Sequence, residues 1–202
     1  MDYAARFPSH STKPKYVAAF LLGDEGSDGY QHLPALLDAC RGVDWNASRL
    51  SKRECCLVGY GAQSIGKVLR CVGYDATNAF HRELFCWLRT LTESDRSEIV
   101  YMATVALGHL GIPPRECRDR LCDLVQSERR PDDQGVFTCR AVAFRALAQV
   151  DRRTAANLVD TVACQEFIDG MRQRADECRT RYHENPRLSQ ELVDEAAWLV
   201  AL

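Results

Sequence analysis

The sequence predicts an all-α protein, an α-solenoid built from about four helical hairpins. A stretch of small and apolar residues at 103–110 has similar copies upstream at 61–68 and downstream at 143–150. Their corresponding residues Ile65, Leu107 and Leu147 lie 42 and 40 residues apart. A constant period of this size is typical of stacked helical repeats.

A second series of apolar stretches lies between the copies of the first. Leu84, Leu121 and Leu158 begin these stretches and are 37 residues apart in each step. Two interleaved periodic series are hard to produce by chance, and each implies one helix of a hairpin. The expected units cover residues of about 30–72, 76–111, 114–150 and 154–202.

The predicted elements begin with an N-terminal part, residues 1–29. It holds an extended arm, a short helix over Lys15–Leu22 and a turn rich in glycine and acidic residues. The solenoid domain is expected to cover 30–202. Its first helix, Tyr30–Arg41, has apolar residues at helical spacing and a proline that a first turn tolerates.

End signals define the next helices. Ser51 and Glu54 form the pattern of a capping box, so they predict a helix over 52–72 that Gly73 ends. Thr77 or Asn78 is expected to cap the following helix at 79–91. The remaining predicted segments are a helix at 99–110, one after Pro114 with its apolar stripe over 117–125, helices at 136–150 and 154–168, a polar helical insertion at about 170–187, and a last apolar helix at 188–202.

A family resemblance follows from these patterns. The segment His32-Leu33-Pro34-Ala35-Leu36-Leu37 and the later Ala106-Leu107-Gly108-His109-Leu110 resemble HEAT and armadillo-type α-helical repeats. The similarity covers residues 30–150 well and 154–202 loosely. It implies a non-enzymatic scaffold or a structural subunit of an assembly. It also extends to HEAT-like alkylpurine DNA glycosylases, which hold DNA on a basic concave face. HEAT-like chromophore lyases are a third possibility, but no residue of this sequence supports it.

Composition weighs against nucleic acid as the partner. The 202-residue chain has a formal net charge of −2, and its basic and acidic residues balance in both halves. A nucleic-acid binder usually carries a basic excess. No apolar run approaches the roughly 20 residues that a membrane-spanning helix needs.

The ten cysteines favour neither a metal centre nor a disulfide framework. No Cys-x-x-Cys pair is present, and Cys117 and Cys122 would lie about 140° apart on a helix. Most of the cysteines lie within apolar stripes, where a free thiol packs as a small hydrophobe. We therefore expect no metal or cofactor, and a reducing intracellular compartment (cytoplasm or organelle matrix) rather than secretion.

Two motifs have a catalytic interpretation and a structural one. Residues 61–67 fit G-x-x-x-x-G-K, but Val68 stands where a phosphate loop needs Ser or Thr, and close helix packing is the favoured interpretation. His81 and His109 are the best general-base candidates, yet the sequence offers neither an orienting partner nor a nucleophile. The sequence therefore predicts no catalytic residue.

Two surfaces are predicted to bind another protein or a second copy of the chain. The second helices of stacked repeats commonly line a concave surface that binds partners. The sequence ends in small and apolar residues, whereas the end repeat of a solenoid normally has a polar outer face. The predicted concave row consists of Gln63, Lys67, Arg70, His109, Arg145 and Gln149. The predicted C-terminal contact consists of Trp198, Leu199 and Leu202. Trp87 is expected in the core, and Trp45 either packs between repeats or contacts a partner.

Overall fold

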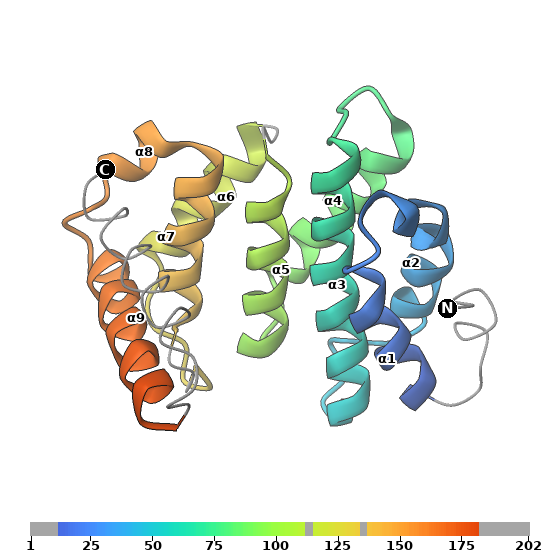
Figure 1. Ribbon diagram of the computed structural model, residues 1–202, viewed down its shortest axis with the longest axis horizontal. Helices are drawn as coiled ribbons and strands as arrows, with labels where there is room; N and C mark the ends of the chain where they lie inside the picture. Colours follow the sequence, from blue (N-terminus) through green and yellow to red (C-terminus); the bar gives the residue numbers. More distant parts are fainter. Residues whose placement is uncertain (1–11, 112–114, 134–136, 182–202) are drawn as a thin grey trace. The chain divides into compact units, whose positions relative to one another are not determined.

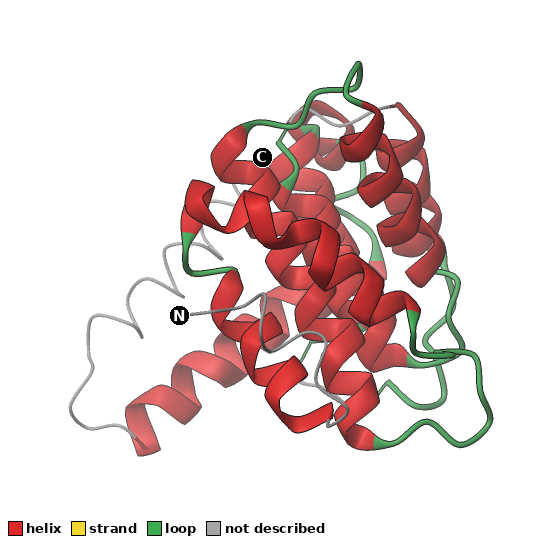
Figure 2. Ribbon diagram, turned by 90° about the vertical axis from the view of Figure 1, so that its right-hand side faces the viewer, coloured by secondary structure: helices red, strands yellow, loops and turns green. Residues whose placement is uncertain are grey.

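The computed structural model describes residues 12–111, 115–133 and 137–181 (Figure 1). Every regular element in these ranges is a helix, and none is a strand (Figure 2). The all-α prediction is therefore confirmed. The chain divides into two compact units, Met1–Cys117 and Arg118–Leu202.

Most of the described helices belong to the first unit. They are α1 (Thr12–Leu22), the 3-10 helix η1 (Gly26–His32), α2 (Leu33–Arg41), α3 (Lys52–Val72), α4 (Ala79–Leu91) and α5 (Ser97–His109). Helix α6 (Arg115–Gln126) crosses the division between the units, and the second unit continues with α7 (Cys139–Val150), α8 (Arg152–Ala156) and α9 (Val162–Arg181). The bounds of α3 and α4 agree with the prediction to the residue.

Local end signals explain why these two helices were predictable. The Ser51 hydroxyl accepts from the Glu54 N–H at 3.3 Å, and the Glu54 carboxylate accepts from the Ser51 N–H at 2.9 Å. Gly73 ends α3 with a φ of +82°, where other residues are strained. Asn78 caps α4 by accepting from the N–H of Phe80 at 2.9 Å. Each signal lies within four residues of the end that it defines.

Helix α3 forms the centre of the first unit, with α1, η1, α2 and α5 packed around it. Its small residues make this possible. A Cβ on Gly66 would lie 2.6 Å from the Cα of Ala106 in α5, and one on Gly61 would lie 2.4 Å from the Cys40 sulfur in α2. The predicted close packing of stretch 61–68 is thus present against stretch 103–110.

The second unit differs from the prediction after residue 150. Instead of a helix over 154–168 and a separate polar insertion, the short α8 is followed by a turn and the continuous α9. The reason is a buried stripe at helical spacing, formed by Ala163, Phe167, Met171 and Ala175, which continues past the buried Gly170. Residues 182–202, including the rest of the predicted insertion and the last helix, lie outside the described residues.

Candidate functional site

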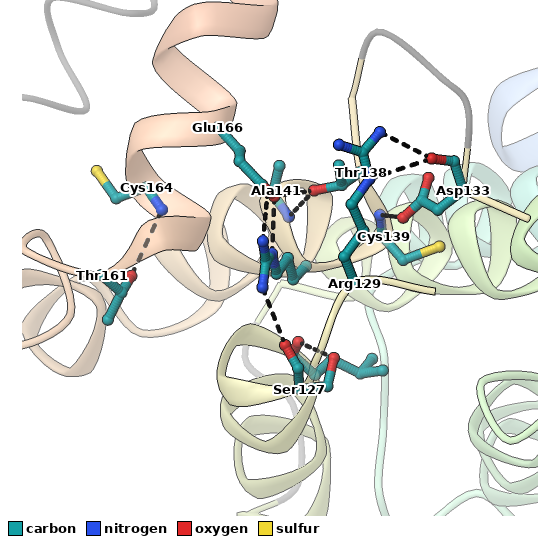
Figure 3. Close-up of polar contacts among 11 residues, drawn as sticks. Ser127, Arg129, Asp133, Thr138, Cys139, Ala141, Thr161, Cys164 and Glu166 are labelled. Carbon is teal, nitrogen blue, oxygen red and sulfur yellow. Dashed lines mark hydrogen bonds and ion pairs between the residues drawn. The ribbon is translucent and has the colours of Figure 1, made fainter. Parts of the chain in front are cut away.

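A connected polar cluster lies between α7 and α9 in the described part of the second unit, and Figure 3 shows it. Arg140 donates from Nε to Glu166 Oε2 at 2.8 Å and from Nη2 to Glu166 Oε1. The Thr138 hydroxyl donates to the same carboxylate at 2.5 Å. Glu166 thus accepts three hydrogen bonds, from the cap and the first turn of α7.

The cluster also includes the loop before α7. Arg140 donates to the Ser127 carbonyl at 3.4 Å, and Arg129 donates to the Asp133 carbonyl at 3.0 Å. The buried Asp133 carboxylate accepts from the Cys139 N–H at 2.6 Å (Figure 3). A carboxylate at a helix N-terminus is favoured by the helix dipole. The end of α6, the start of α7 and the second turn of α9 are therefore joined by one set of charge-assisted hydrogen bonds.

The electrostatics of this cluster suit a structural brace. Hydrogen bonds from Arg140, and also from Thr138, hold the pKa of Glu166 below its usual range, and the same carboxylate raises the pKa of Arg140. Both groups therefore remain charged near neutral pH. A general base needs a pKa near the working pH. The pKa of Glu166 is instead lowered, away from neutral pH, so its carboxylate is a poor base. It is well suited to hold Arg140 and Thr138 in place.

His81 has a defined structural environment in the first unit. Its Nδ1 accepts from the Asp75 N–H at 3.0 Å, so this nitrogen carries no proton. In the neutral ring Nε2 then carries the proton and donates to the Tyr30 hydroxyl at 3.0 Å. Both ring nitrogens have partners, and burial lowers the pKa of His81. The histidine proposed from the sequence as a base is engaged in holding a loop.

The residues of the predicted concave row have different surroundings. Gln63, His109 and Arg145 are half-buried, whereas Arg70 and Gln149 are exposed. Lys67 forms an ion pair with Asp24 at 2.9 Å. One turn away, the Ser64 hydroxyl donates to the Ala19 carbonyl of α1 at 2.5 Å.

Helix α1 therefore lies against the part of α3 that contributes to the row. Four residues of the row belong to the first unit, and Arg145 and Gln149 belong to the second. The predicted C-terminal contact of Trp198, Leu199 and Leu202 lies outside the described residues.

The phosphate-loop interpretation of residues 61–67 is excluded by their conformation. All seven lie inside the regular helix α3, where backbone N–H groups bond within the helix and cannot surround a phosphate. Trp87 is buried, as predicted. Trp45 is half-buried in the connection between α2 and α3, which Arg96 holds by donating to the Ala47 carbonyl at 3.2 Å.

The described cysteines whose thiols can be placed are free. Burial raises the pKa of Cys40, Cys55 and Cys117 to about 12 in each case. Cys55 also donates to the Glu98 carboxylate at 3.1 Å. Within the described ranges no group of three or more His, Cys, Asp or Glu residues is placed to hold a metal ion.

The reactivity of each thiol should follow its exposure to solvent. We expect a disulfide reagent at pH 8 to modify the exposed Cys71 and Cys86 within minutes, because nucleophilic attack needs an accessible thiolate. Cys40 and Cys117 should react only after unfolding. Peptide mass mapping of the native and the urea-treated protein measures this. Equal labelling of Cys40 and Cys71 in the native protein would contradict the packing of α2 against α3.

Neither a protein-family model, nor a curated protein, nor a solved structure matches this chain. None of the described helices has the length and apolar character to cross a membrane. The polar cluster of Figure 3 was missed from the sequence, although Arg140 and Glu166 form a partly buried ion pair in it. The sequence contained one signal for this cluster, because Arg140 is a charged residue in the first turn of a helix made mostly of small residues.

Proposed function

We propose that the chain is a HEAT-like α-solenoid that acts as a protein-interaction scaffold or as a structural subunit of a larger assembly. The observation that carries the proposal is the direct packing of two copies of the repeated stretch, with Gly66 against the backbone of Ala106. Repeat proteins stack equivalent helices in this way, and their function lies in the extended surface that results.

The use of arginine supports a protein partner over DNA. In the second unit, Arg118, Arg130, Arg140, Arg172 and Arg174 each form an ion pair with a carboxylate. In the first unit Arg41 pairs with Glu83 and Lys67 pairs with Asp24. Phosphate contacts need basic side chains that carboxylates leave available. Together with the formal net charge of −2, these pairs make the alternative, a HEAT-like nucleic-acid-binding protein or a glycosylase-like enzyme, the weaker proposal.

Site-specific photo-crosslinking tests the scaffold proposal. A photoreactive amino acid replaces the exposed Arg70 or Gln149 of the predicted row, and Arg89 on the exposed side of α4 serves as the matched control. In cells of the native source, we expect Arg70 and Gln149 to crosslink to the same polypeptide and Arg89 to crosslink to none. Equal crosslinking from all three positions would contradict a specific row.

The nucleic-acid alternative has its own measurement. Phosphate-dominated binding weakens steeply with salt. Retention on DNA cellulose at low salt that is lost on raising the salt would favour the alternative, and no retention at low salt would remove it.

For the C-terminal contact, Trp198→Asp should abolish co-purification of a partner without loss of helix content.

A further inference from the structure

The connection between α3 and α4 is held in place by the side chain of His81. His81, only 5% exposed, accepts from the Asp75 N–H in this connection and donates to Tyr30 in η1. Tyr74 stacks on the His81 ring with centroids 6.0 Å apart, and the Tyr30 ring meets it edge-on at 5.5 Å. The His81 imidazole thus joins the connection that precedes α4 to Tyr30 of η1, which lies 51 residues earlier in the chain.

Protonation would change this arrangement at a single atom. The second proton of an imidazolium can bind only at Nδ1, because Nε2 already carries the first. Nδ1 would then be a donor that faces the Asp75 N–H, which is also a donor. The hydrogen bond would be lost, and a charge would lie among the rings of Tyr30 and Tyr74.

The charged and titratable groups around His81 do not compensate for this loss. Asp75, in the connection, is the carboxylate that attracts an imidazolium, but its Oδ1 already accepts from the N–H and the hydroxyl of Thr77. Tyr30 from η1 and Tyr74 from the connection contribute neutral phenols. Arg82, the next residue of α4, donates to the Ala76 carbonyl and adds a like charge. Burial outweighs the attraction of Asp75, and the pKa of His81 is lowered as a result.

We propose that His81 is an acid-sensitive latch, which holds residues 73–78 and η1 together in its neutral form and releases them when it is protonated. Release frees Tyr74 from His81 and Tyr30 from its hydrogen bond, so that an aromatic surface opens beside α4. Since protonation favours the open form, the latch is closed above the ordinary histidine pKa of about 6.5 and opens as the pH falls below it.

Hydrogen exchange with the full chain tests the latch. After correction for the intrinsic exchange rate, we expect the opening of residues 74–80 and 26–32 to increase between pH 7.5 and 5.5. The increase can reach about tenfold for each pH unit below the ordinary histidine pKa, because one proton is taken up. Exchange of α5 and α7 should change little over the same range.

Two variants isolate the atom responsible. His81→Asn keeps an acceptor near the position of Nδ1 but does not titrate, so the pH dependence should vanish. Tyr30→Phe removes the partner of Nε2 and leaves the Asp75 contact, so the pH dependence should remain. Unchanged exchange of the wild type between the two pH values, or the same pH dependence in His81→Asn, would overturn the proposal.

A nitrogen NMR titration of the wild type covers the case in which His81→Asn does not fold. We expect the His81 spectrum at pH 7.5 to have the proton on Nε2 and none on Nδ1. A proton on Nδ1 at that pH, or a His81 pKa at or above 6.5, would overturn the latch as well.

Discussion

Replacing Gly66 by alanine should destabilise the protein by about 3 kcal/mol. The new Cβ would lie 2.6 Å from the Cα and 2.7 Å from the carbonyl oxygen of Ala106. These are backbone atoms of α5, so no side-chain rotation can relieve the contact, and the two helices must separate. Overpacking of a core in this way costs roughly 1–3 kcal/mol and sometimes more. Urea denaturation followed by circular dichroism gives the change in the free energy of unfolding.

Gly59→Ala is the matched control on the same helix. A Cβ there would meet the Met102 side chain, whose Cγ lies 3.2 Å away and can move. Because alanine favours a helix over glycine by up to about 1 kcal/mol, this variant should be neutral or slightly stabilising. Adding Ala106→Gly to Gly66→Ala should recover only part of the loss, since the backbone contacts remain. A Gly66→Ala protein as stable as Gly59→Ala would show that α3 and α5 are not in contact at this point.

The helices that the sequence predicted well are those defined by nearby residues. The Ser51–Glu54 capping box and Gly73 bracket α3, and each acts within the helix end that it marks. After residue 150 the sequence predicted one helix over 154–168, but residues 157–161 form the turn between the five-residue α8 and α9. The stripe through Phe167 and Met171 becomes visible only when the partner helix α7 is known. Tertiary packing therefore decided what local spacing could not.

The surroundings of the candidate site residues were less predictable for the same reason. Lys67 looked available for a partner, but its ion pair with Asp24 depends on how α1 lies against α3. His81 was recognised as chemically interesting, whereas its role follows from Tyr30, 51 residues earlier in the chain. The repeat period predicts which helices are equivalent, and it contains no information about which polar side chains their neighbours engage.

The ion pair between Arg140 and Glu166 should be the most important polar contact of the second unit. Both side chains are about one-fifth exposed, and Thr138 shares the carboxylate. We expect Glu166→Ala to lower the free energy of unfolding by about 2–4 kcal/mol, because a partly buried guanidinium and a hydroxyl lose their acceptor together. Asp169→Ala, which breaks the exposed pair with Arg172, should cost at most about 0.5 kcal/mol. Urea denaturation at neutral pH compares the two variants.

A pH series then separates the charge of Glu166 from its packing. Its folded pKa lies below the unfolded value near 4.5, so its stabilisation is present above that value and is lost as the pH falls through the folded pKa. Glu166→Gln keeps the shape of the side chain without its charge, so the difference in stability from the wild type should shrink in acid. The double variant Arg140→Met with Glu166→Gln should lose less stability than the sum of the two single variants. Each single change leaves one charged partner unpaired or without its charged acceptor, whereas the double change leaves no unpaired charge. Additive losses, or a constant difference across the pH series, would mean that the two side chains contribute as separate surface charges and that α9 is held to α7 by its apolar stripe alone.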